Sequence, residues 1–194
     1  ACRDTPSPAA PTALAATVSG TSVTLSWQAA SDAQTPAVGL TYNVRVGTNA
    51  GGLQRMSPQA DTTTGRRRLP AFGNVQLGTN ATLTGLTPGV NYFWSVQAVD
   101  NAFAGSAFAA EGSFTVPIPT APVLITGQVQ TNGFRIQGNG APGWDYGIEA
   151  VTNLTTSAAV WLRLGTRTTD ASGRFEFTDT NAPLPRRFYR GVYP

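Results

Sequence analysis

The sequence contains no histidine and no lysine, and only one cysteine and one methionine among its 194 residues. Without histidine and lysine, the chain lacks imidazole acid–base catalysis, Schiff-base lysines and the lysine of phosphate-binding loops. The lone Cys2 cannot form an internal disulfide, and zinc would find almost no nitrogen or sulfur ligands. These absences exclude the usual machinery of most enzyme classes. We expect no cofactor and no metal site.

Charged residues are also scarce, at 12% of the chain. Thirteen arginines against ten acidic residues give a net charge of +3, and their dispersal gives no reason to expect a nucleic-acid partner. The ten acids fall in no recognisable motif, so the paired carboxylates that a glycosidase needs are not evident. No apolar run reaches the roughly 18 residues of a membrane-spanning helix. We therefore expect no transmembrane segment.

The first part of the chain has the two-residue hydrophobic period of β-strands. Alternation predicts strands at 14–18, 23–27, 42–46, 81–84, 92–98 and 112–116, with a weak edge strand at 53–56. About seven strands without any helical period indicate a β-sandwich. Asn43 and Arg45 alternate with apolar residues, so we expect them on the solvent-facing side of their sheet. The irregular segment 47–80 is a long excursion of the kind that is often functional or mobile.

Proline-rich segments divide the chain into domains. Residues 1–10 are predicted to be an extended lead-in, poorly packed, ahead of a domain at 11–116. Residues 117–122, with three prolines, form a stiff linker before a second domain at 123–194. Alternation resumes in this second part. The sequence therefore predicts an all-β chain of two tandem β-sandwich domains, the second smaller and immunoglobulin-like or jelly-roll-like.

The first domain resembles the fibronectin type III domain. The resemblance is carried by Trp27, Tyr42, the segment Leu86-Thr87-Pro88-Gly89-Val90-Asn91-Tyr92 and the alternating Trp94, Val96 and Ala98. It implies that Leu86, Pro88 and Tyr92 form a structural corner, in which the tyrosine hydroxyl bonds back to the backbone. The long irregular segment after Gly47 departs from the family pattern, so the positions of the middle strands are not assigned by the resemblance.

Finer similarities point to exported proteins. Residues 57–61, 67–70 and 95–100 resemble the version of this domain found in large exported repeat proteins of environmental bacteria. Residues 144–150, 152–154 and 179–190, with Trp161, resemble the small C-terminal β-domain of many exported multidomain proteins of Verrucomicrobia-like bacteria. This second resemblance implies export and a cell-surface context rather than an activity.

Two groups of residues are candidate ligand sites. Arg66, Arg67 and Arg68 could bind an anionic glycan or a phosphate through forked guanidinium contacts, or could be a solvated loop. Trp144 and Tyr146 could form an aromatic platform for sugar stacking, or could belong to the core. Neither pattern identifies a ligand by itself.

The lead-in offers two kinds of attachment. Cys2 could carry a lipid anchor, form an intermolecular disulfide or be incidental. The extended lead-in could also add as a strand to the open sheet edge of a neighbouring subunit.

The function favoured by these observations is that of a non-catalytic, extracellular structural or adhesive protein of the bacterial surface, which could assemble into fibres by strand addition. Its expected partners are copies of itself or other surface proteins, with polysaccharide as a further possibility. The alternative is a carbohydrate-binding accessory module of a larger secreted hydrolase, which predicts exposed aromatic residues in a row. An enzyme would need a cleft between paired carboxylates.

Overall fold

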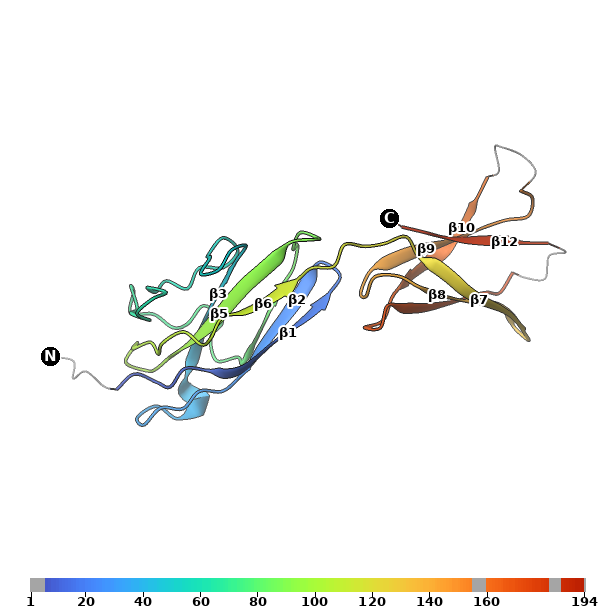
Figure 1. Ribbon diagram of the computed structural model, residues 1–194. Coiled ribbons are helices and arrows are strands. Elements are labelled where there is room, and N and C mark those ends of the chain that lie inside the picture. Colours follow the sequence, from blue (N-terminus) through green and yellow to red (C-terminus); the bar gives the residue numbers. More distant parts are fainter. Residues whose placement is uncertain (1–5, 155–159, 182–185, 194) are drawn as a thin grey trace. The chain divides into compact units, whose positions relative to one another are not determined.

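The computed structural model describes residues 6–154, 160–181 and 186–193 of the chain. Contacts divide the chain into two compact units, Ala1–Val116 and Pro117–Pro194 (Figure 1). Apart from one short 3-10 helix, η1 (Ala37–Gly39), every regular element of the described residues is a β-strand. The prediction of an all-β chain is therefore confirmed. Cys2 and the first half of the predicted lead-in lie outside the described residues.

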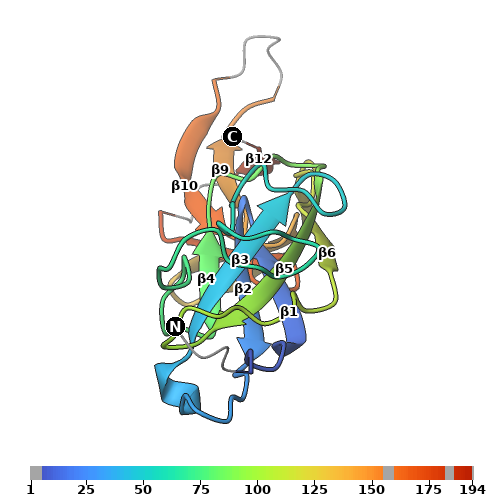
Figure 2. The same ribbon diagram turned by 90° about the vertical axis from the view of Figure 1, so that its left-hand side faces the viewer.

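Unit 1 contains two three-stranded sheets. One has the order β1 (Thr12–Ser19), β2 (Ser22–Gln28), β4 (Asn80–Leu83), and the other has the order β3 (Thr41–Gly47), β5 (Asn91–Val99), β6 (Gly112–Thr115) (Figure 2). All of the pairings are antiparallel. The edge strand expected at 53–56 is only an isolated bridge between Met56 and Val46. The unit thus has six strands rather than seven.

The core of unit 1 lies between the two sheets. In β5 the alternating residues Tyr92, Trp94, Val96 and Ala98 are all at most 2% exposed. Trp27 of the other sheet packs against Trp94 at a ring-centroid distance of 6.4 Å. Burying each of the large apolar side chains contributes about 1.5–3 kcal/mol, which lets this unit fold without a disulfide.

The opposite face of the β3–β5–β6 sheet is covered. All seven residues of β3 are buried, including Asn43 at 1% and Arg45 at 6% exposure. The prediction of a solvent-facing side was wrong, because residues 48–79 and 100–111 pack over it (Figure 2). In β3 one set of alternating side chains faces the apolar core, and the other set faces a buried polar layer rather than water.

Unit 2 is a smaller pair of three-stranded sheets. One has the order β10 (Leu162–Thr168), β9 (Asp145–Val151), β12 (Phe188–Val192), and the other has the order β11 (Arg174–Asp179), β8 (Gly133–Asn139), β7 (Val123–Gln130). Four buried residues form its apolar cluster: Ile136, Ile148, Phe175 and Phe177. Partly buried neighbours extend this cluster, with the rings of Phe134 and Tyr189 stacked at 5.2 Å.

The segments that flank unit 1 are partly held in place. Residues 6–11 form no strand, but Pro8 and Pro11 are buried and the N–H of Ala9 donates to the carbonyl of Ser31 over 2.9 Å. This described part of the lead-in is therefore packed more tightly than the sequence suggested. In the linker, Thr120 accepts a hydrogen bond of 2.9 Å from the hydroxyl of Tyr146. No helix among the described residues is long and apolar enough to cross a membrane.

Candidate functional site

The corner before β5 is closed by the hydroxyl of Tyr92. This hydroxyl accepts a hydrogen bond of 3.0 Å from the N–H of Thr87, while its ring stacks on Phe114 at 5.4 Å. Leu86 is 2% exposed and half-buried Pro88 follows it in the turn. The polar end of a buried phenol thus satisfies a backbone donor that would otherwise be unpaired.

Tyr146 has a similar role in unit 2 and offers no ring face to a ligand. It is fully buried, and its hydroxyl accepts from the N–H of Ala141 over 2.8 Å. Trp144 is half-buried and meets Tyr193 with the two rings tilted by 58°. A sugar platform built from Trp144 and Tyr146 is therefore not present, because one ring belongs to the core.

The three consecutive arginines do not act as one cationic group. Arg66 and Arg68 are exposed, whereas Arg67 is partly buried. The guanidinium of Arg67 donates to the carbonyl oxygens of Pro58 at 3.2 Å and Ala71 at 2.7 Å. Burial lowers the pKa of Arg67, but a guanidinium still keeps its proton at neutral pH. The middle residue therefore holds the loop together, and two exposed guanidinium groups remain.

The buried polar layer consists of Asn43, Arg45, Ser95 and Gln97, which lie on the covered face of β3 and β5. Asn43 donates to the side chain of Gln97 over 3.0 Å and to the carbonyl of Pro58. Gln97 in turn donates to the carbonyl of Ser106 over 2.7 Å and to that of Gly65. These side chains fasten both covering segments to the sheet, because each one satisfies carbonyls that have no strand partner.

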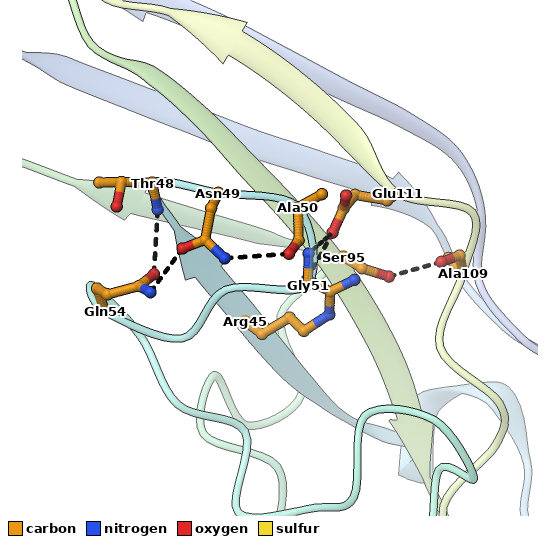
Figure 3. Close-up of polar contacts among 9 residues, drawn as sticks. All are labelled: Arg45, Thr48, Asn49, Ala50, Gly51, Gln54, Ser95, Ala109 and Glu111. Atoms are coloured by element: carbon orange, nitrogen blue, oxygen red, sulfur yellow. Dashed lines mark hydrogen bonds and ion pairs between the residues drawn. The ribbon is translucent and has the colours of Figure 1, made fainter.

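Arg45 and Glu111 fasten one end of this layer (Figure 3). A guanidinium nitrogen of Arg45 lies 2.7 Å from a carboxylate oxygen of Glu111, with side-chain exposures of 7% and 25%. The same carboxylate oxygen accepts from the N–H of Gly51 over 2.8 Å. In the adjoining turn, Gln54 donates to Asn49 over 2.7 Å. A single carboxylate thus holds the turn at residues 48–54 against β3.

The outer edge of β3 is also occupied. The side-chain amide of Asn74 accepts from the N–H of Val44 at 2.8 Å and donates to its carbonyl at 2.7 Å, as a neighbouring strand would. Backbone groups of Gln76 and Val75 pair with Tyr42 at 2.8 and 3.1 Å. A Cβ at Gly73 would lie 2.0 Å from the carbonyl oxygen of Tyr42, so only glycine permits this approach. β3 therefore offers no free edge to another chain.

The acidic residues of exposed turns are used for capping. The backbone N–H of Thr35 is the main cause of the lowered pKa of Asp32, and that of Thr64 has this effect on Asp61. The hydroxyl of Ser172 is the main cause for Asp170. Among the residues that the structure describes, no three His, Cys, Asp or Glu side chains gather where they could hold a metal ion.

Comparison with known families now decides the class of unit 1. The model of the fibronectin type III domain matches residues 9–113, which is more than half of the chain. The chain belongs to the fibronectin type III domain family. No curated protein matches the sequence.

Two solved structures align over nearly all of this fibronectin type III protein, with little sequence identity. The chitinase ChiA74 from Bacillus thuringiensis aligns over 100% of this chain at 15% identity and a TM-score of 0.39. The chain spans only 28% of the length of that chitinase. The chicken interferon gamma receptor alpha chain aligns over 97% of this chain and 90% of its own length, at 11% identity and a TM-score of 0.41.

The feature of this fibronectin type III unit that the sequence did not reveal is the polar layer. Ser95 and Gln97 are uncharged polar residues on alternate positions of the most apolar strand, and both are 0% exposed. Nothing in the sequence signals their burial, because the exposed strands β1 and β7 also carry no charge while the buried layer contains Arg45. Asn74 could not be found from its sequence context, since its role depends on the path of a loop without period.

Proposed function

We propose that this chain is a non-catalytic structural or adhesive part of an exported protein, and that it works at the cell exterior by self-association or by contact with other surface proteins. Membership of the fibronectin type III family supports a module role, because such sandwiches mainly space and present other parts of a protein. The resemblance of residues 123–194 to an exported C-terminal domain supports the location.

The observation that carries this proposal is the sealed face of unit 1. A covering of two segments hides the outer face of the β3–β5–β6 sheet, and its polar groups are used in internal hydrogen bonds. This sealed face therefore has the side chains of its polar layer engaged in internal contacts and does not present them to a substrate. It does make the unit resistant to local opening, which is what a spacer outside the cell requires.

Assembly through the lead-in is less well supported than assembly through another part of the chain. Pro6, Pro8 and Pro11 lack the N–H that a donated strand needs, and two of them are buried in unit 1. A fibre joined by residues 6–11 would first have to free them. Strand addition is therefore better supported at an edge strand outside residues 6–11.

Mass and location together test the proposal. We expect light scattering of the purified chain to show a mass above 20.2 kDa that rises with concentration, and negative-stain images to show its assemblies. An antibody against unit 1 should label intact cells of the source organism. A strictly intracellular protein would contradict the location. A monomer that is retained on an insoluble polysaccharide would instead favour the carbohydrate-binding alternative.

A further inference from the structure

The strand β7 leaves one side unpaired in unit 2. It runs over the eight residues Val123–Gln130 and pairs with β8, and within the described residues no other strand pairs with it. Gln130 faces Gly133 across a two-residue turn, so this pair closes the hairpin. Because antiparallel pairing alternates, Gln128 then bonds to β8 while the N–H and C=O groups of Gly127 and Val129 point to the open side.

β7 carries no charge, and it exposes three large apolar side chains beside the polar Thr126, Gln128 and Gln130. Val123, Ile125 and Val129 are 62%, 56% and 86% exposed, and the strand contains no charged residue. The other edge strands of unit 2, β10, β11 and β12, each carry at least one charged side chain. Charges on an edge strand oppose pairing with other chains. β7 is therefore the edge of this unit that lacks this protection.

A groove runs beside this edge. It has a volume of ≈ 350 Å³ and lies between β7 and β12. Leu124, Phe134 and Ile136 line one side of it, and Arg187 and Tyr189 line the other. A strand added to β7 would alternate its inward side chains into this groove, which would remove apolar surface from water while its backbone pairs with Gly127 and Val129.

We propose that β7 of one copy pairs antiparallel with β7 of a second copy, so that two three-stranded β11–β8–β7 sheets join into one continuous sheet. A second copy is the occupant that the strand itself favours, because an uncharged strand meets no like charge when it faces itself. The strand β7 also keeps a backbone N–H at every residue for pairing, whereas residues 6–11 include three prolines that lack one.

The symmetry of this contact limits the assembly. Two identical edges that pair antiparallel make a two-fold interface, which closes at a dimer rather than growing into a fibre. The interface would be of the small class that dissociates readily, so dimerisation should depend on concentration. This inference names the partner surface of the self-association proposed above and rests on it.

Sedimentation velocity of the whole chain over a concentration series tests this contact. All variants carry Cys2→Ser, so that no disulfide joins the copies. We expect a reversible rise from 20.2 kDa to twice that mass, and Val129→Lys should weaken it at least tenfold, since two lysines would then enter one interface. Val129→Pro should do the same, because it removes an N–H that faces the open side.

The matched control is Val38→Lys in unit 1. Val38 is 87% exposed, close to the 86% of Val129, and lies far along the chain in η1. Dimerisation should be unchanged in this variant. If Val129→Lys and Val129→Pro dimerise like the control, the β7 contact is wrong although self-association stands. If the unmodified chain is monomeric at every concentration, both the contact and the proposed self-association fail.

A cysteine series defines the register. Single cysteines at Thr126, Gln128 and Gln130 alternate along β7 and so share one face of the strand. In a two-fold pair, disulfide formation should peak at the residue nearest the axis and fall at its neighbours. Equal crosslinking at all three positions would indicate unspecific contact and overturn the proposal.

Discussion

Unit 1 packs eighteen buried residues into one apolar cluster, whereas the corresponding cluster of unit 2 has four among the described residues. Unit 1 also covers the outer face of one sheet and the edge of β3. Unit 2 leaves the apolar edge strand β7 exposed. A unit with a large core keeps its shape by itself, while a unit with a small core gains more from a partner. If the proposed β7 contact forms, unit 1 supplies the rigidity and unit 2 the association.

The largest expected effect is the loss of unit 2 on truncation of its core. Phe177→Ala removes one of the four buried members of the cluster, which costs about 3–5 kcal/mol. That cost is close to the whole stability of a domain with so small a core. We expect the unfolding transition of unit 2 to disappear in calorimetry.

Truncation of the larger core should lower stability without abolishing the fold. Trp94→Ala in unit 1 carries the same expected penalty of about 3–5 kcal/mol, but seventeen other buried residues remain. The transition of unit 1 should shift to a lower temperature and persist. Loss of the unit 1 transition with retention of that of unit 2 would reverse the comparison.

Ion pairs that differ in burial should also differ in their contribution to stability. Glu111→Ala leaves Arg45, whose side chain is 7% exposed, without its carboxylate and frees the turn at Gly51. We expect a loss of about 2 kcal/mol, below the cost for a fully buried pair because Glu111 is partly exposed. The control Glu176→Ala breaks the pair between Arg135 and Glu176, whose side chains are 29% and 48% exposed, and should cost clearly less because solvent screens an exposed pair.

Denaturant unfolding followed by tryptophan fluorescence can measure both variants, since each unit has two of the four tryptophans. Equal losses in Glu111→Ala and Glu176→Ala would show that the covering segments add little to unit 1. Faster proteolysis within residues 48–54 of Glu111→Ala alone would show that this turn depends on the carboxylate.

A smaller effect is expected at the corner. Tyr92→Phe removes the acceptor of the Thr87 N–H and keeps the ring on Phe114, so we expect unit 1 to lose about 1 kcal/mol. An unchanged denaturation midpoint would mean that water replaces the hydroxyl. Tyr193→Phe is a control, because Tyr193 is 48% exposed and lies in unit 2.

Most of the fold could be predicted from local sequence patterns. Alternation marked β5 because its inward side chains are large and apolar, and the spacing of Leu86, Pro88 and Tyr92 marked a corner because its defining hydrogen bond joins residues only five apart. Such features depend on neighbours in the sequence. They can be predicted without knowledge of the path of distant loops.

The covered face could not be predicted in this way. Asn43 and Arg45 alternate with apolar residues just as they would beside water, and only the return of residues 48–79 and 100–111 decides that they are buried. The burial of Tyr146 could not be predicted for the same reason, since alternation shows which residues share a face of a strand but not which face is buried. Contacts between segments far apart in the sequence produce no periodic pattern from which burial could be predicted.

The smallest expected effect concerns the pH dependence of unit 2. Burial, and then the carboxylate of Asp179 at 2.9 Å from its hydroxyl, raise the pKa of Tyr189 from 10.0 to about 12. The neutral phenol is thus favoured in the folded unit, while the unfolded chain loses the proton first. The stabilisation is complete below pH 10 and declines as the pH rises toward 12. We expect the urea midpoint of unit 2 to fall over this range, and Tyr189→Phe to remove that part of the slope while leaving unit 1 unchanged. If Tyr189→Phe keeps the full dependence of the urea midpoint on pH, the hydroxyl of Tyr189 is not its source. Bonding to a carboxylate, as in Tyr189, would then affect stability no more than bonding to a backbone N–H, as in Tyr92.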